Sequence, residues 1–108
     1  MTVRQLTETD KFSSAVICDG DREITGVYIG DLLSCVMGRA KSSDAWITIM
    51  SNVNILAVAA LADTSCIILS EGVKLTDDVL ETAKQKEINI VYTSLTTYDA
   101  AIFLNEVL

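Results

Sequence analysis

Strand-like and helix-like segments alternate three times after residue 45, and this alternation constrains the fold more than any other feature of the chain. The strand-like apolar runs are residues 45–50, 66–69 and 90–92. The segments with helical apolar spacing are residues 53–62, 77–86 and 96 onward. Such alternation is typical of βαβ units. We therefore predict an α/β fold, a three-layer domain whose largely parallel sheet lies between helices.

The N-terminal half is less regular, but its apolar pattern still predicts four elements. We expect a turn of helix at 3–6, strands at 12–18 and 24–29, and a helix from Asp31 to about residue 39. The first two strands are candidates for an antiparallel pair at one edge of the sheet. The chain has no proline and only five glycines, so nothing in it reads as a linker. We expect a single domain over residues 1–108.

Composition excludes several classes of function. The formal net charge is −7 and the eight basic residues are scattered, which disfavours nucleic acid and anionic membranes as partners. The longest apolar run, residues 55–62, is far shorter than the roughly 20 residues of a spanning helix. The N-terminus has no apolar signal region, so we expect the protein in the cytosol. Half of the residues are hydrophobic, which favours an apolar contact surface and hence a homodimer.

The titratable residues offer no familiar catalytic set. The chain has no histidine, which removes the Ser-His and Cys-His dyads and most zinc sites. Cys18, Cys35 and Cys66 each lie in an apolar context without a C-x-x-C pair, so we expect buried small hydrophobes. We predict no catalytic residues, no metal site and no cofactor. Trp46 opens a strand and is expected in the core or at an interface.

Small and polar residues follow the predicted parallel strands, where ligands of open α/β sheets bind. The candidate ligand-binding residues at these strand ends are Gly30, Asp31, Thr48, Asn52, Asn54, Ser70 and Thr93. Helix N-termini at this edge would present free backbone N–H groups to a carboxylate or phosphate. The alternative interpretation is that several of these side chains are only helix caps. The residues with that alternative role are Asp31, Asn52, Asn54, Thr76 and Thr96.

The segment DREITG carries a further signal, because its Asp21, Arg22, Thr25 and Gly26 match the namesake motif of the DRTGG domain family, which the chain resembles. The similarity continues through Tyr28, Gly30 to Ser34, Met37, Ala45 to Ile49, Asn54, Ala57 to Asp63, Cys66 to Leu69, Ile88 to Ile90, Ser94, Leu95 and Tyr98. The second glycine of the motif is Val27 here. A β-branched side chain fills the space that glycine would leave beside the backbone.

The resemblance implies an architecture and a role. The family is similar to the N-terminal domains of HPr kinase/phosphorylase and of the Mur ligase MurF. It also occurs as an accessory domain in phosphotransacetylases and, beside CBS domains, in regulatory pyrophosphatases. In these proteins it is a non-catalytic module at or near subunit contacts. Short stand-alone members occur in anaerobic bacteria near iron-only hydrogenase genes.

These observations favour a non-catalytic regulatory or interaction module, a homodimer that senses a small anionic ligand or a nucleotide, or that binds a protein partner. Two alternatives remain. One is a small enzyme that uses Asp31 or Glu71 as an acid/base group. The other is an accessory protein of iron-only hydrogenase systems whose three cysteines hold a cluster.

Overall fold

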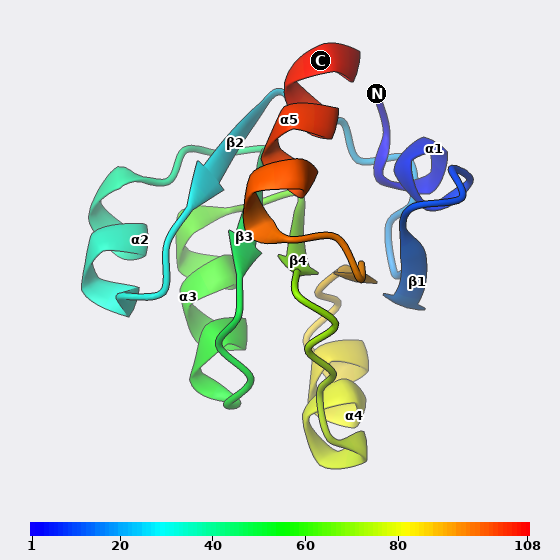
Figure 1. Cartoon of the computed structure of the whole chain (residues 1–108). Coiled ribbons are helices and arrows are strands. Elements are labelled where there is room, and N and C mark those ends of the chain that lie inside the picture. The colour runs from blue at the N-terminus through cyan, green and yellow to red at the C-terminus, as the bar shows by residue number, and fades with distance from the viewer.

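The computed structural model describes all residues of the chain, 1–108. The elements are α1 (Val3–Thr7), β1 (Ser13–Val16), β2 (Gly26–Ile29), α2 (Leu33–Arg39), β3 (Asp44–Thr48), α3 (Asn54–Ala62), β4 (Cys66–Leu69), α4 (Asp77–Gln85), β5 (Ile90–Tyr92) and α5 (Thr97–Val107). Figure 1 shows this order along the chain. Every predicted element is present, with ends that differ by a few residues, so the predicted alternation of strands and helices is confirmed.

One five-stranded sheet has the order β1-β5-β4-β3-β2. The four strands β2 to β5 are parallel neighbours, and β1 pairs antiparallel with β5. The suggested pairing of the first two strands with each other is therefore wrong, because β1 and β2 form opposite edges of the sheet. The stretch between them, residues 17–25, crosses the whole sheet along the edge where the parallel strands begin.

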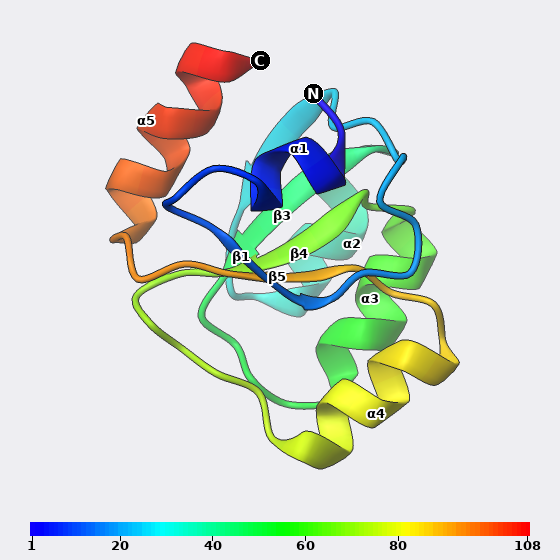
Figure 2. The ribbon, with the colours of Figure 1, turned by 90° about the vertical axis from the view of Figure 1, so that its right-hand side faces the viewer.

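Helices cover both faces of the sheet, which confirms the three-layer α/β architecture. Figure 2 shows α1 and α5 on one side of the sheet and α3 and α4 on the other. Successive side chains of a strand point to opposite faces. Trp46 and Ile67 accordingly pack in the core beneath α2, α3 and α4. Ala45 and Ile68 pack in the second core beneath α1 and α5. The sheet is thus buried from both sides, as its near-continuous apolar strands require.

Helix α3 is less buried than its composition suggests. A helix as apolar and alanine-rich as this one is typical of a buried position. One face, which includes Ile55 and Leu56, is buried, whereas Ala57 and Leu61 are exposed. The helix lies in an outer layer, where it packs against the sheet and against α2 and leaves its outer side to solvent.

Two of the predicted helix caps are confirmed. The Thr76 hydroxyl accepts a hydrogen bond from Val79 N at the start of α4, and the Thr96 hydroxyl accepts one from Asp99 N at the start of α5. Each cap satisfies one of the backbone donors that a helix N-terminus leaves free.

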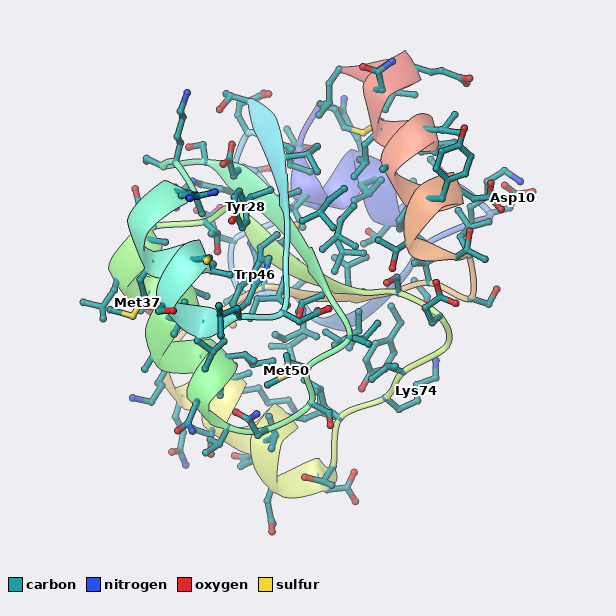
Figure 3. The ribbon with its side chains drawn as sticks, turned by 60° about the vertical axis from the view of Figure 1, so that its left-hand side comes forward. Asp10, Tyr28, Met37, Trp46, Met50 and Lys74 are labelled. Atoms are coloured by element: carbon teal, nitrogen blue, oxygen red, sulfur yellow. The ribbon has the colours of Figure 1, made fainter.

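The predicted core position of Trp46 is confirmed. Its side chain is fully buried, and its indole Nε1 donates to the Gly30 carbonyl oxygen at 2.9 Å. Figure 3 shows Trp46 and Tyr28 side by side, next to α2. This hydrogen bond fixes the end of edge strand β2 against β3. No helix of the chain has the length and apolar character needed to span a membrane.

Candidate functional site

The strand ends predicted to hold a ligand lie along one edge of the sheet. Because β2, β3, β4 and β5 are parallel, their carboxyl ends face the same way. This edge, called the carboxyl rim below, carries all seven predicted ligand-binding residues, directly at the strand ends or in the segments that follow them. Their hydrogen bonds divide them into residues that face solvent and residues that fasten the rim internally.

Asp31 links the ends of two neighbouring strands. Its Oδ1 accepts hydrogen bonds from Thr48 Oγ1 at 2.8 Å and from Ile49 N at 3.0 Å. It does not cap α2, whose N-cap residue is Leu32 and makes no side-chain cap bond. The suggested cap role of Asp31 is therefore wrong. The carboxylate instead holds the loop after β3 in place, next to the Gly30 turn.

The loop that leads from β3 into α3 has unused backbone donors. The N–H groups of Ser51, Asn52 and Val53 donate to no protein atom, and all three residues are exposed. The Asn52 side-chain Oδ1 accepts from Asn54 N at 3.0 Å, which fixes the loop in a turn before the helix. Three consecutive free N–H groups ahead of a helix N-terminus form an arrangement suited to an anion.

Ser70 and Thr93 fasten the rim rather than face solvent. Ser70 is fully buried, and its Oγ lies 2.7 Å from Thr97 Oγ1 at the start of α5. Thr93 is 4% exposed, and its Oγ1 donates to the Lys11 carbonyl oxygen at 2.7 Å. Both hydroxyls therefore form hydrogen bonds within the protein, and both bind segments that are distant in the sequence.

Basic side chains gather at the β5 end of the same rim. Lys11 and Lys74 border a cavity of about 210 Å³ together with Thr93 and Ser94. The Lys74 Nζ lies 4.2 Å from the centroid of the Tyr92 ring, a cation–π contact that orients the ammonium group. Figure 3 labels Lys74 on the loop that leads from β4 to α4. The rim thus carries two lysines at this end, together with Asp10, which borders the same cavity.

The two carboxylates considered as acid/base groups do not share a site. Asp31 binds the loop after β3, whereas Glu71 Oε2 accepts from Thr97 N at 2.8 Å, at the N-terminus of α5. Neither residue lines any of the five cavities of the molecule. The geometry therefore gives the enzyme alternative no paired carboxylates to build on.

The three cysteines are also apart. Cys66 is buried in β4, as predicted, and burial raises the pKa of its thiol to about 12. Cys18 is exposed and Cys35 is partly exposed, so the prediction that all three are buried is wrong. No group of three or more cysteine, aspartate or glutamate side chains is close enough to hold a metal ion. The structure supplies no ligand set for the proposed cluster.

The motif residues lie at the opposite edge of the sheet, where the parallel strands begin. Asp21 forms an ion pair with Arg4 of α1. Arg22 Nη2 donates to the Asp63 carbonyl oxygen at 2.8 Å in the turn after α3, and to Ser43 Oγ at 3.2 Å in the turn before β3. Thr25 N donates to the Ser43 carbonyl oxygen at 3.0 Å. The motif therefore joins three chain segments at this edge.

Gly26 and Val27 show why the two motif glycine positions differ. A Cβ atom at Gly26 would lie 2.6 Å from Asp44 Oδ1, so this position requires glycine. Val27 pairs with Ala45 in the parallel ladder and packs at the margin of the core beneath α5. The backbone approaches a neighbour closely at the first position only, so a β-branched residue is accommodated at the second.

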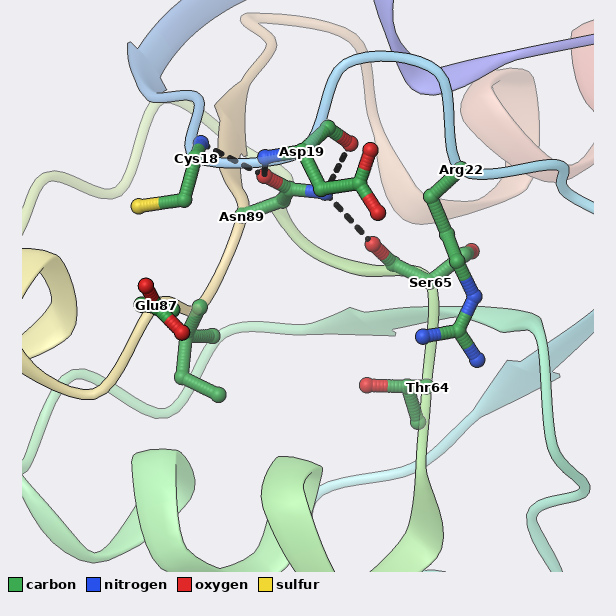
Figure 4. Close-up of a pocket in the computed structure, with 8 residues that line it drawn as sticks. Cys18, Asp19, Arg22, Thr64, Ser65, Glu87 and Asn89 are labelled. Carbon is green, nitrogen blue, oxygen red and sulfur yellow. Dashed lines mark hydrogen bonds between the residues drawn. The ribbon is translucent and has the colours of Figure 1, made fainter.

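Sequence reasoning missed a polar cavity of about 290 Å³ at this second edge. Figure 4 shows its lining residues, which come from three separate segments: Cys18, Asp19, Arg22, Thr64, Ser65, Glu87, Ile88 and Asn89. The available signal was Asn89, a polar residue directly before the apolar strand β5, whose amide is now found buried. A buried amide must be hydrogen-bonded, and its partners mark the place where these segments meet.

Comparisons with known proteins agree with this architecture. A family model described as the DRTGG domain matches residues 1–107. A solved structure of the CBS and DRTGG domains of the regulatory region of Clostridium perfringens pyrophosphatase, complexed with the activator diadenosine tetraphosphate, matches with a TM-score of 0.64. It is 16% identical over 83% of this chain, and the match spans 40% of that chain, so the likeness shows the fold. No curated protein sequence matches the chain significantly.

Proposed function

The chain belongs to the DRTGG domain family, and we propose that it is a non-catalytic regulatory module that senses a small anionic ligand or a nucleotide at the carboxyl rim and works as a homodimer. The similar solved structure is part of a regulatory region and was determined with an activator bound. We also keep the predicted cytosolic location as part of this proposal.

The observation that carries the ligand proposal is the row of free backbone N–H groups at Ser51, Asn52 and Val53. Backbone donors at a helix N-terminus bind phosphate without any catalytic side chain. Lys74 lies at the other end of the same rim and supplies a positive charge for a second phosphate or a carboxylate. A ligand with several phosphates suits such an extended edge better than a single small anion.

Thermal denaturation with AMP, ADP, ATP, diadenosine tetraphosphate and inorganic phosphate tests this proposal. A ligand present at 100 times its Kd adds about 2.7 kcal/mol to the free energy of unfolding. Amide chemical shifts should locate the ligand at residues 51–54. A panel in which no compound raises Tm or shifts these amides would contradict the ligand proposal and leave a protein partner as the better account.

A matched pair of variants isolates the backbone donors. Val53 has φ −64°, the angle that proline adopts, and its N–H has no partner within the protein. Val53→Pro removes one donor of the site, and Val53→Ala keeps it. We expect Val53→Pro to weaken nucleotide binding about tenfold, as the loss of one charge-assisted hydrogen bond implies, with Val53→Ala unchanged. Equal affinities for the two variants would exclude this loop as the site.

The homodimer proposal rests on the edge strand β2. An edge strand leaves backbone groups unpaired, and here it carries the exposed side chain of Ile29, which is 47% exposed. Ile29 and Leu108 border one cavity of about 460 Å³ between β2 and α5. A second copy of the chain placed across a two-fold axis would cover this apolar edge.

Sedimentation at micromolar concentration tests the dimer. We expect Ile29→Lys to give monomers, because a charged residue on an edge strand opposes pairing. Leu61→Lys is the matched control, since Leu61 is 72% exposed on α3, on the other face of the sheet. A monomeric wild-type protein, or a dimer that survives Ile29→Lys, would refute this interface.

A further inference from the structure

The cavity at the amino ends of β4 and β5 has the features of a second binding site. Its volume of about 290 Å³ lies at the lower limit of ligand pockets, which suits a small metabolite. Six of its eight lining residues are polar or charged. It lies on the edge of the sheet opposite the carboxyl rim, so it is independent of the site proposed above.

Asn89 holds the walls of this cavity in a fixed arrangement. Its Oδ1 accepts from Cys18 N at 2.8 Å and Asp19 N at 2.9 Å. Its Nδ2 donates to the carbonyl oxygens of Asp19 at 2.8 Å and Ser65 at 3.0 Å, and Figure 4 shows these four bonds. The amide therefore has no capacity left for a ligand. Its role is to preorganise the site, which reduces the ordering cost of binding.

The charged side chains that line this cavity have free hydrogen-bonding capacity. Arg22 uses only Nη2 within the protein, so its Nη1 and Nε donors have no protein acceptor. The carboxylates of Asp19 and Glu87 accept no hydrogen bond and form no ion pair. The cavity thus presents one guanidinium and two carboxylates, all without a complete set of partners.

Thr64 adds an unsatisfied group to the same wall. Its Oγ1 is the one buried side-chain polar atom of the protein without a hydrogen-bond partner. Figure 4 shows Thr64 in the cavity wall beside Arg22. A buried hydroxyl without a partner is unfavourable, and such a group in a native structure indicates a partner that the protein alone does not supply.

The mixture of charges selects the ligand chemistry. A simple anion that approaches Arg22 meets the two carboxylates, and a simple amine meets the guanidinium. The carboxylates and the thiol are not close enough to one another to hold a metal ion. We propose that this cavity binds a free α-amino acid, with its carboxylate on the free Nη1 group of Arg22 and its ammonium group between Asp19 and Glu87.

Amide chemical-shift titrations with each of the common amino acids, up to about 10 mM, test this assignment. We expect at least one amino acid to shift the amides of Cys18, Asp19, Ser65 and Asn89 while those of residues 51–54 stay unchanged. For the amino acid that binds, the analogues without the ammonium group and without the carboxylate serve as comparison probes. For L-alanine these are propionate and ethylamine. The affinity of each should be lower than that of the amino acid by at least about tenfold.

Variants of the unpaired acids provide the second measurement. Glu87→Gln and Asp19→Asn remove charges that no protein group uses, so the fold is retained, and each should weaken amino-acid binding about tenfold. Arg22→Lys keeps the charge but removes the free Nη1 donors, with a similar expected loss. Glu81→Gln, an exposed acid of α4, is the control. No amide shift with any amino acid, equal binding of the ammonium-free analogue, or unchanged affinity in both acid variants would overturn the proposal.

Discussion

Arg22 Nη2 lies 3.1 Å from Asp63 Oδ1 and 2.8 Å from the carbonyl oxygen of the same residue. Asp63 is the C-cap residue of α3 and has the left-handed backbone angle φ 58°. One guanidinium nitrogen therefore binds both the side chain and the backbone of the residue that ends the helix. This contact connects the motif segment to the turn between α3 and β4.

Acid should weaken this contact. The hydrogen bond from Ser42 and the one from Arg22 lower the pKa of Asp63 below its usual 3.8. A group whose pKa is lower in the folded state stabilises the protein above its unfolded pKa and loses this effect as pH falls through the folded pKa. Asp63→Asn should reduce stability at pH 7 by at most about 1 kcal/mol, because the carboxylate is largely exposed.

The difference in urea stability between wild type and Asp63→Asn should shrink below about pH 4. Asparagine tolerates the left-handed backbone angle, so the variant tests the charge alone. Glu106→Gln, an exposed acid of α5 without an ion pair, is the control. A difference that stays constant from pH 7 to below pH 4 would contradict the role assigned to the ionised carboxylate.

Gly26→Ala should destabilise the fold by about 1–3 kcal/mol, the usual effect of forcing an extra carbon into a packed site. The added Cβ would lie 2.6 Å from Asp44 Oδ1. Asp44 cannot move freely, because it is 7% exposed and its Oδ2 accepts from Lys41 N at 2.8 Å.

Thermal denaturation measures this effect, and the chain offers a glycine control. A Cβ at Gly38 would meet no atom within 4 Å, and Gly38 lies inside α2. Gly38→Ala should therefore raise stability by up to about 1 kcal/mol. The prediction fails if both substitutions change Tm in the same direction.

Asn89→Ala should reduce the free energy of unfolding by at least about 2 kcal/mol. The substitution removes four hydrogen bonds. It leaves the N–H groups of Cys18 and Asp19 and the buried carbonyl of Ser65 without a partner, while the Asp19 carbonyl keeps its bond from Arg22 N at 3.4 Å. Asn105→Ala on the exposed side of α5 should change stability by less than about 0.5 kcal/mol. Equal urea midpoints for the two variants would show that the four bonds contribute little.

The three cysteines should react with a thiol reagent at different rates. The thiolate is the reactive form, so reactivity follows exposure and thiol pKa. Cys18 is exposed and should react first, followed by the partly exposed Cys35. Cys66 is buried with its pKa raised to about 12, so it should react only when urea unfolds the protein. Three equally fast thiols in the native protein would contradict the described burial.

The sequence predicted the elements well because each is a local pattern. The apolar runs of β3, β4 and β5 and the caps Thr76 and Thr96 depend on neighbouring residues alone. The position of β1 was not predictable in this way. It pairs with β5 rather than with β2, and no local spacing records which distant strand a segment joins.

The candidate sites show the same limit of prediction from local sequence patterns. The carboxyl rim was predictable, because parallel strands bring their ends together whatever the side chains are. The hydrogen bonds that Ser70 and Thr93 make within the protein were not predictable, since their partners, Thr97 and the Lys11 backbone, are distant in the sequence. The cavity around Asn89 also depends on contacts between distant segments, and its charged residues look like ordinary surface residues in the sequence.

The antiparallel pair of β1 and β5 has a consequence for synthesis on the ribosome. Strand β1 leaves the exit tunnel early, but the strand it pairs with follows only after α4. Cys18 and its hydrogen-bond partner Asn89 are 71 positions apart in the chain. The units from β2 to β4 can assemble in order as they emerge. Strand β1 stays unpaired until β5 has been translated, so its addition to the sheet is a late step in the folding of each nascent chain.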